Sequence, residues 1–378
     1  MFSYPLLSIY EKEIPKFLLT AVNAPPVQRL QEVGMNCGCE YTAFPLLVRS
    51  IPYSRYDHSL GTALIVWHFT HNEAQALSGL FHDISTPTFA HVIDFLKGDY
   101  LVQETTEEGT AQIIRCDATL QELLNSLGLQ TEDVSDYHRY PIADNDSPRL
   151  SADRLEYSLG NMLNYRIRPL AAVQRMYDDL IVSENEDGVP ELAFLHSDTA
   201  LDFSFAALSC GEIYVSDEDR YTMQRLAELI REAVSDGVIS ESDLYRTEPA
   251  LIAKLNSFPA YAQRWAEFRA MNCTVRSKTD QGGAWRKIHA KKRCIDPLIV
   301  GAGRVSAVSE PFRTALEDFL QCPQDCWILG FEAQPEYSGS PRTSNTDIMK
   351  KAQSGGNDMP FDRNKLIEWL DRHTVTRT

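Results

Sequence analysis

The sequence predicts a mainly helical protein with a smaller appended α+β portion toward its C-terminal end. Three observations support this prediction. Apolar residues recur at helical spacing through residue 165. Almost no run in that stretch has the alternation or the β-branched enrichment that is typical of a strand. Two later runs, at 291–300 and 326–334, are rich in β-branched or aromatic residues and indicate a small sheet.

The individual elements follow from the same patterns and from the residues that begin and end helices. Residues 1–22 form a lead-in, and Pro25 and Pro26 mark the beginning of a short helix. Residues 37–52, which contain Gly and Pro, are expected to form a hairpin or an extended loop. The helices expected next are 59–72, 73–84, 88–96, 106–127 and 150–165, with a turn-rich loop at 140–148.

The second half of the chain is expected to contain helices at 191–209, 217–235 and 251–271 before the small sheet. Residues 338–360 are rich in Gly, Ser and Asn, and we expect a mobile loop there, followed by a last helix at 361–373. The prediction divides the chain into the lead-in 1–22, a helical core 23–200, and a C-terminal helical region with a small sheet, 201–378.

The composition limits the classes of function. The chain has 36 basic and 53 acidic residues and a net charge of −17, which argues against nucleic acid as a partner. A nucleotide is still acceptable, because a metal ion and a few arginines can reverse the sign of the potential locally. No apolar run approaches the ~20 residues of a membrane span, and residues 1–5 lack the features of a signal peptide. With ordinary usage of eight cysteines, we expect free thiols, a cytoplasmic location and no membrane partner.

An ordered set of histidines and aspartates is the most informative feature of the chain: His58, His82, Asp83 and Asp153. Imidazole nitrogens and carboxylate oxygens together suit a divalent transition metal. Successive helical residues are rotated by about 100°, so His82 and Asp83 can hold one ion only at the end of a helix, and Pro87 ends the helix nearby. The sequence therefore predicts one divalent ion, for which Fe, Mn, Ni, Co, Zn and Mg are all suitable.

Three blocks around these residues resemble a known family. RYDHSLGT at 55–62, HDISTPTFAHVID at 82–94 and SADRLEY at 151–157 are similar, in the same order, to blocks of the dNTP triphosphohydrolase branch of the HD superfamily of metal-dependent phosphohydrolases. Gln28-Arg29-Leu30 resembles a further block. The resemblance extends over about residues 23–165. It implies an HD-domain helical core, His58, His82, Asp83 and Asp153 as metal ligands, and a homo-oligomer, a dimer or larger.

The resemblance also assigns roles to other positions. It implies that Arg55 contacts phosphate, that Arg154 and Tyr157 lie near the phosphates, and that Asn161 lies near the sugar, where the family has Asp. His91 matches a histidine that faces the phosphates. Asp94 follows one helical turn later and is placed to orient it.

Two positions depart from the family pattern. Thr86 stands where the family has the last histidine of His-Asp-x-x-His, and Thr106 replaces a second histidine. A threonine does not exchange a proton near pH 7. Either a glutamate near Thr106 takes over proton transfer or the chemistry differs. The expected catalytic residues are His91, Asp94, Glu104 and Glu108.

The favoured function is hydrolysis of a nucleotide, a dNTP included, or of a related phosphate ester by a metal-activated water. The alternatives are a 5′-nucleotidase-like phosphomonoesterase and a non-catalytic, nucleotide-binding regulator. Two other features each allow two interpretations. Asp144 and Asp146 either hydrogen-bond within their own turn, or orient a metal ligand or bind a second metal ion. The basic run 286–293 is either a solvated face or a segment that closes over an anionic ligand or a partner subunit.

Overall fold

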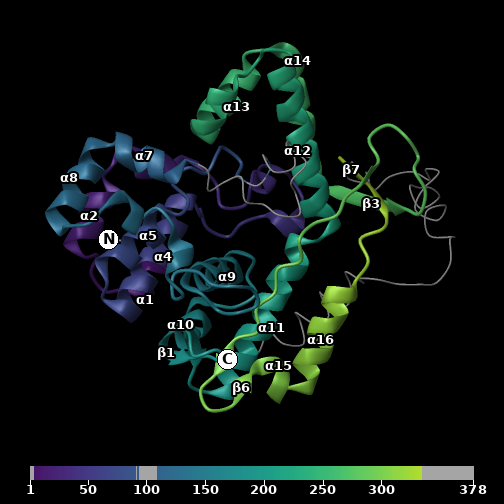
Figure 1. Ribbon diagram of the computed structural model, residues 1–378. Helices are drawn as coiled ribbons and strands as arrows, with labels where there is room; N and C mark the ends of the chain where they lie inside the picture. The colour runs from purple at the N-terminus through teal and green to yellow at the C-terminus, as the bar shows by residue number, and fades with distance from the viewer. Residues whose placement is uncertain (1–3, 91, 93–108, 334–378) are drawn as a thin grey trace.

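The computed structural model describes residues 4–90, 92 and 109–333, and Figure 1 shows how they are arranged. The first helices are α1 (Leu7–Tyr10), α2 (Lys16–Val22), α3 (Pro25–Arg29), α4 (Arg55–Thr70), α5 (Glu73–Phe81), α7 (Thr110–Cys116) and α8 (Ala118–Leu127). The later helices are α9 (Ala152–Asn164), α10 (Leu170–Asp178), α11 (Ser197–Tyr214), α12 (Asp217–Ser235), α13 (Glu248–Asn256), α14 (Pro259–Ala270), α15 (Val305–Val308) and α16 (Glu310–Gln321). Short 3₁₀ helices are η1 (Leu30–Glu32), η2 (Cys39–Tyr41), η3 (Pro45–Leu47), η5 (Thr131–Asp133), η6 (Tyr137–Arg139) and η7 (Glu241–Tyr245). The predicted, mainly helical fold class is confirmed.

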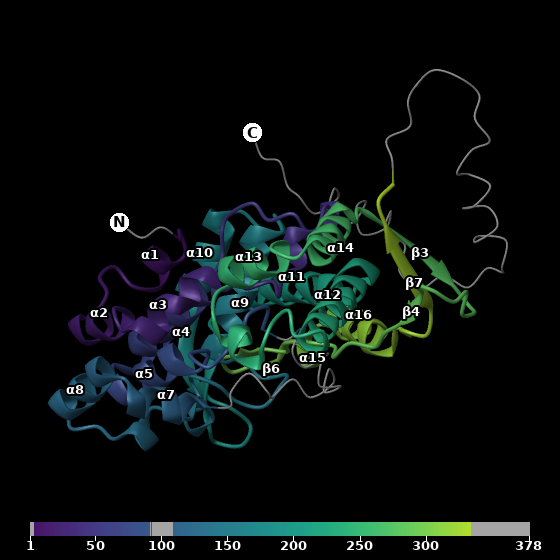
Figure 2. The ribbon, with the colours of Figure 1, turned by 90° about the horizontal axis from the view of Figure 1, so that it is seen from above.

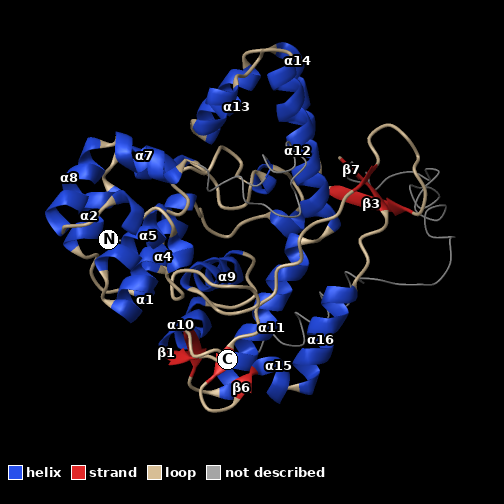
Figure 3. Cartoon of the chain, in the orientation of Figure 1, coloured by secondary structure: helices blue, strands red, loops and turns tan. Residues whose placement is uncertain are grey.

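The strands form two small sheets at separate places, one near α10 and α15 and one beyond α12 (Figure 3). They are β1 (Leu180–Glu184), β2 (Pro190–Phe194), β3 (Cys273–Ser277), β4 (Arg286–Lys287), β5 (Leu298–Ile299), β6 (Gly303–Arg304) and β7 (Trp327–Phe331). The first sheet has the order β1-β2-β5-β6, in which only β2 and β5 are parallel. The second has the order β3-β7-β4 and is antiparallel. The pairing of β2 with β5 joins the two sides of the boundary predicted at residue 200.

One hydrophobic cluster runs through the described chain from Tyr4 to Ile328. Within it, α4 packs against both α5 and α9, and Figure 2 shows α4 between these two helices. The approach of α4 to α9 depends on Gly61, because a Cβ atom there would lie 2.7 Å from Cγ of the buried Glu156 on α9. The glycine thus lets two helices come close enough to share a site.

The prediction of a helix from residue 191 was wrong at its beginning. Residues 190–194 form β2, which pairs with β1 as an antiparallel hairpin, and the helix begins only at Ser197. The turn between the strands contains Asp187-Gly188, and Gly188 has a φ of 72°. A Gly that follows Asp is a common signal of a hairpin turn. This dipeptide therefore marks the turn, although the acidic and apolar pattern from residue 191 onward predicted a helix.

Several predicted boundaries also need correction. The helix expected at 59–72 begins earlier, at Arg55. Of the two expectations for 37–52, a hairpin or an extended loop, the structure has a loop with two 3₁₀ turns. The helix expected at 106–127 is broken at Asp117, whose side chain accepts a hydrogen bond from Leu120 N and so caps α8. The helix expected at 251–271 is divided before Pro259, which opens α14.

Other predicted elements are only partly described. Of the run 291–300, only β5 is a strand. The helix expected at 88–96, the loop at 338–360 and the last helix at 361–373 lie largely or wholly outside the described residues. None of the eight cysteines, all of which belong to the described residues, forms a disulfide. Among the described residues, no helix combines the length and the apolar character that crossing a bilayer requires.

A buried carboxyl group packs α13 against the N-terminal loop and gives a pH-dependent prediction. Glu248 is 2% exposed and accepts hydrogen bonds from Gly34 N and Tyr41 Oη, each at 2.8 Å. Burial, reinforced by the nearby Glu40, raises the pKa of Glu248 to about 7. In the unfolded chain a glutamate has a pKa of about 4.3. Between these values the folded state binds more protons than the unfolded state, so the free energy of unfolding falls as the pH rises from about 4 to 7.

We expect Glu248→Gln to flatten this pH dependence by about 2–4 kcal/mol, because glutamine keeps the acceptor for Gly34 without becoming charged. The measurement is urea unfolding at pH 4.5, 6 and 8. Glu241→Gln, at an exposed position in η7, serves as the matched control and should leave the slope unchanged. Equal slopes in the wild type and Glu248→Gln would contradict this account.

Candidate metal centre

The N-terminal end of α4 positions Arg55 and His58. Ser54 accepts a hydrogen bond from Asp57 N, and the Asp57 carboxylate accepts one from Ser54 N, so the two residues form a capping box. The box fixes the beginning of the helix at Arg55, which places His58 about one turn into it. The Ser-x-x-Asp signature at 54–57 is the sequence signal for the earlier helix start.

The other ligand candidates also lie at helix ends. His82 is the C-cap residue of α5, and Asp83 follows it, as the adjacent pair requires if both are to face one ion. Asp153 is the second residue of α9, whose first turn is held by Ser151: its hydroxyl accepts a hydrogen bond from Arg154 N. Three helix ends that are distant in the sequence therefore place His and Asp side chains close to one another.

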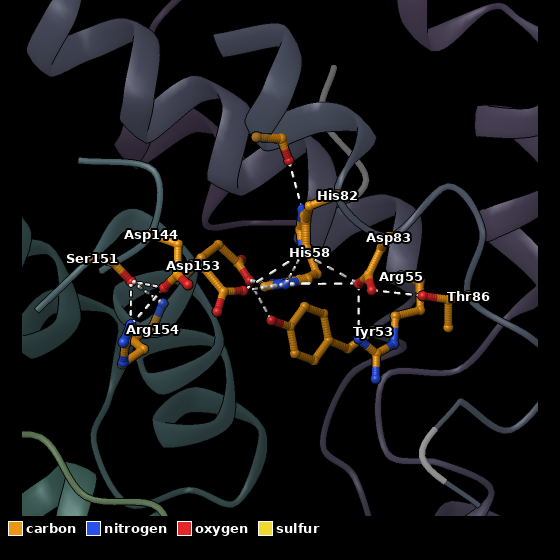
Figure 4. A network of polar contacts seen from close by, with 12 residues as sticks. Tyr53, Arg55, His58, His82, Asp83, Thr86, Asp144, Ser151, Asp153 and Arg154 are labelled. Atoms are coloured by element: carbon orange, nitrogen blue, oxygen red, sulfur yellow. Dashed lines mark hydrogen bonds and ion pairs between the residues drawn. The ribbon is translucent and has the colours of Figure 1, made fainter. Parts of the chain in front are cut away.

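The four predicted ligands converge there (Figure 4). His58 Nε2 lies 3.1 Å from His82 Nε2, 3.0 Å from Asp153 Oδ1 and 3.9 Å from Asp83 Oδ2. His82 Nε2 lies 3.5 Å from Asp83 Oδ2 and 3.6 Å from Asp153 Oδ1. With metal–ligand bonds of about 2.0–2.2 Å, neighbouring ligand atoms are about 3.0–3.5 Å apart. The ligand atoms of His58, His82 and Asp83 all lie within 4.8 Å of one another, a group that could hold one ion. Asp153 is not part of that group and approaches the two imidazoles from the side opposite Asp83.

Both imidazole rings are oriented by their other nitrogen. His58 Nδ1 donates to Glu156 Oε2 at 2.6 Å, and His82 Nδ1 donates to the Gly79 carbonyl at 2.7 Å. Each Nε2 atom is thereby left to face the centre as a ligand. Glu156 is completely buried and also accepts a hydrogen bond from Tyr53 Oη at 2.5 Å.

Arg55 and Thr86 hold Asp83 in place. Arg55 Nη1 donates to Asp83 Oδ2 at 2.8 Å, and Thr86 Oγ1 donates to Asp83 Oδ1 at 2.7 Å. Burial opposes ionisation of Asp83, but Arg55 and the two histidines outweigh it and hold its pKa well below the usual range. Thr86, the position where the resembling family has a histidine, thus serves as a hydrogen-bond donor to a candidate ligand carboxylate.

The electrostatics of the centre fit a divalent cation. Asp83, Asp153 and Glu156 bring three carboxylates, Arg55 brings one guanidinium, and with neutral imidazoles the sum is −2. Burial lowers the pKa of His58, but Asp153 and Glu156 outweigh it and raise the pKa to about 10. The surroundings of the His58 ring therefore strongly favour a positive charge. A divalent ion between the two Nε2 atoms would balance the carboxylates and separate the two facing lone pairs.

The residues predicted to bind substrate fall into two groups. Arg55 lies at the centre itself. Arg154, Tyr157 and Asn161 follow Asp153 along α9, with Tyr157 and Asn161 one and two turns further on. Arg154 Nη1 donates to Asp144 Oδ1 at 2.6 Å, so its guanidinium is bound to the 140–148 loop. Burial raises the pKa of Tyr157 to about 12, and its hydroxyl therefore stays protonated at neutral pH.

Asn161 differs from the other residues of this row in having an acceptor without a partner. It is 5% exposed, and its Nδ2 donates to Tyr214 Oη at 2.8 Å. Its Oδ1 has no hydrogen-bond partner among the described residues. The predicted catalytic residues His91, Asp94, Glu104 and Glu108 lie outside the described residues, so their roles stay predictions.

Sequence reasoning missed Glu156 and Tyr137. Glu156 lies one helical turn after Asp153, among apolar residues of the buried face of α9, and a carboxylate there is a signal for a buried partner. Tyr137 stacks on the His82 ring with a centroid distance of 4.9 Å. No local pattern marks Tyr137, because its position depends on how the 131–148 segment folds back over α5. Of the two interpretations of Asp144, the structure favours a role beside the centre, through its contact with Arg154.

Comparisons with known proteins agree with this picture of the fold. No family model matches the chain. The chain is 27% identical over 235 residues to the uncharacterized protein YdhJ of Bacillus subtilis, covering 61% of this chain and 68% of that one. It is 24% identical over 246 residues to the metal-dependent phosphohydrolase cns2 of Cordyceps militaris, covering 64% and 69%. A crystal structure of a phosphohydrolase from Bacteroides thetaiotaomicron matches with a TM-score of 0.57 at 15% identity, over 85% of this chain and 97% of that chain. This last likeness shows a shared fold.

Proposed function

We propose that this chain is a metal-dependent phosphohydrolase that acts on a nucleotide or a related small phosphate ester. The observation that carries the proposal is the convergence of His58, His82, Asp83 and Asp153, with each imidazole oriented by a hydrogen bond from Nδ1. The name of the Cordyceps militaris relative and the resemblance of the blocks at 55–62, 82–94 and 151–157 support the same reaction class.

The residues of the centre have separable tasks. His58 and His82, through Nε2, and Asp83 and Asp153, through one oxygen each, would hold the ion. When bound, a divalent ion polarises a phosphoryl oxygen and lowers the pKa of a water molecule. Arg55 keeps Asp83 ionised, and its buried Nε has no partner among the described residues. That N–H is therefore available to a phosphoryl oxygen, in keeping with the preference of guanidinium groups for phosphate.

The row along α9 supports a nucleotide as the substrate. The Tyr157 hydroxyl is a neutral donor one turn from Asp153, and the unpartnered Oδ1 of Asn161 is an acceptor two turns away. A phosphate at the centre would place a sugar hydroxyl along this row, where Asn161 accepts a hydrogen bond from it.

Hydrolysis of a phosphate monoester is the second candidate, and one contact favours it over triphosphate release. The family histidine that serves proton transfer is replaced by Thr86, whose hydroxyl is engaged with Asp83 Oδ1 at 2.7 Å. A nucleotidase-like reaction needs the metal centre and a donor for the leaving group, and Thr86 is not required for either.

The test combines metal analysis with a substrate panel. The purified protein should contain close to one equivalent of a divalent metal. Phosphate or triphosphate release should appear with at least one of the dNTPs, NTPs, nucleoside monophosphates or guanosine alarmones, stop after chelation and return when metal is added. A protein that binds metal and nucleotide but turns over no compound of the panel would identify the non-catalytic regulator instead.

A further inference from the structure

A histidine that the family pattern does not include lies beside the metal centre. His138 belongs to η6, whose backbone is fixed by Asp136: the Asp136 carboxylate accepts a hydrogen bond from His138 N at 3.1 Å. The ring of His138 contacts the ring of Tyr137, with a centroid distance of 4.4 Å. Tyr137 in turn stacks on the metal-ligand candidate His82 at 4.9 Å and an interplanar angle of 28°. One stacked ring therefore separates His138 from His82.

A second set of contacts ties His138 to α9. His138 Nδ1 lies 2.8 Å from Asp144 Oδ2. The other oxygen of Asp144 accepts hydrogen bonds from Arg154 Nη1 at 2.6 Å and from Ser151 Oγ at 3.1 Å. Beside Asp144, the Ala143 carbonyl accepts a hydrogen bond from the backbone nitrogen of Asp153, itself a ligand candidate. The position of Asp144 is thus fixed relative to the centre, and Asp144 fixes the ring of His138.

His138 and Asp144 differ in burial, as the two members of a catalytic dyad do. The Asp144 side chain is 10% exposed, whereas the His138 side chain is 52% exposed. The carboxylate is held inside the protein, and about half of the imidazole side chain is exposed to solvent. Figure 4 places Asp144, Ser151 and Arg154 on the Asp153 side of the centre and Arg55 on the Asp83 side. A phosphate bound between these sides would have Arg55 on one flank and the Asp144 pair on the other.

We propose that His138, oriented by Asp144, is the catalytic residue that gives a proton to the leaving group. The inference rests on the proposed function and deepens it, because it supplies the proton transfer that Thr86 and Thr106 cannot perform. With Nδ1 donating to Asp144, the proton that moves is the one on Nε2. The arrangement is that of a histidine whose tautomer is set by a carboxylate.

The step balances as an ordinary hydrolysis. The oxygen of water forms a bond to phosphorus, and the bond from phosphorus to the leaving oxygen breaks with its electron pair on that oxygen. The Nε2 proton of His138 moves to the same oxygen, so an alcohol leaves instead of an alkoxide. The proton lost by the attacking water restores the charged imidazole. One water is consumed, and an alcohol and inorganic phosphate are formed.

A leaving-group comparison tests the role. 4-Nitrophenolate leaves without a proton, whereas the sugar hydroxyl of a nucleoside monophosphate needs one. We expect His138→Gln to lower kcat for the best nucleoside monophosphate about 10²–10³-fold and to change kcat for 4-nitrophenyl phosphate less than threefold. Metal content should stay at the wild-type level. Added imidazole should restore part of the activity of His138→Ala toward the nucleotide, and Asp144→Asn should show a smaller loss with the same leaving-group dependence.

Other outcomes overturn the inference in distinguishable ways. An equal loss on both substrates, or a loss of bound metal, would show that His138 only supports the fold of the centre. A wild-type protein that releases phosphate or triphosphate from another compound of the panel but hydrolyses neither monoester would overturn this inference and leave the proposed function standing. The matched control is His196→Gln, because His196 is likewise an exposed histidine paired with a carboxylate, Asp179 at 2.5 Å, at the beginning of α11. It should leave both activities unchanged.

Discussion

Replacement of Asp83 by alanine is expected to remove the metal and lower phosphate release by about a thousandfold or more. The estimate follows because a bound ion contributes several kcal/mol to such a transition state, and about 4 kcal/mol corresponds to three orders of magnitude. Asp83 is 5% exposed and lies within 4.0 Å of Nε2 of both His58 and His82. Its removal leaves the centre one ligand short.

The same substitution also leaves Arg55 without its carboxylate partner, so folding must be checked separately. Asp83→Asn retains an acceptor for Arg55 Nη1 and a side chain of the same size, and it isolates the loss of charge. The measurements are metal content by elemental analysis, phosphate release, and Tm with and without chelator. The control is Asp198→Asn, an exposed position in the first turn of α11. An Asp83→Ala protein that is fully active and free of metal would refute the site.

Replacement of Glu156 by glutamine is expected to weaken metal affinity about 10–100-fold without removing a ligand. Glu156 accepts the Nδ1 proton of His58 and hydrogen bonds from Tyr53 Oη and Tyr10 Oη. Glutamine keeps the shape and one acceptor oxygen, but its neutral amide makes the His58 ring a weaker donor of electron density and presents an NH₂ group where two donors already point. The weaker binding should appear as a higher metal dissociation constant, whereas kcat at saturating metal should be affected less.

A competition titration against a coloured chelator measures this change directly. Glu191 offers a matched control, because it is also completely buried and is paired with Arg304, but it belongs to β2 in the first sheet. Glu191→Gln should lower the free energy of unfolding and leave metal affinity as in the wild type. If Glu156→Gln bound metal as tightly as the wild type, the orientation of His58 by Glu156 would have no part in metal binding.

The ligand candidates could be found in the sequence because each belongs to a short local pattern. Ser54 and Asp57 place His58 in the first turns of a helix, and Ser151 places Asp153 in the first turn of another. An adjacent His-Asp pair can face one ion only at a helix end, and the residues after Asp83 end the helix. Residue order, together with the resemblance of the surrounding blocks to a known family, selected these candidates, and the caps explain why they lie at helix ends.

The later half of the chain was harder to predict because its strands are short and their partners are distant in the sequence. β5 has two residues and pairs with β2, which lies about a hundred residues earlier. A two-residue strand has no detectable period, so only the completed sheet identifies it. The helix predicted from residue 191 was wrong at its beginning for a different reason: four of the five residues of β2 are buried, so the strand lacks the buried and exposed alternation of a half-exposed strand.

By itself, the sequence predicted the helical core from its helical period, and the set of metal-ligand candidates from residue order and from the resemblance of their blocks to a known family. Only the tertiary structure decided what surrounds those ligands. The burial of Glu156 against Gly61, the stacking of Tyr137 on His82 and the pairing of His138 with Asp144 all join segments through packing. Such contacts depend on distances between elements and leave no period or motif in the chain, because any of several side chains could have filled the same space.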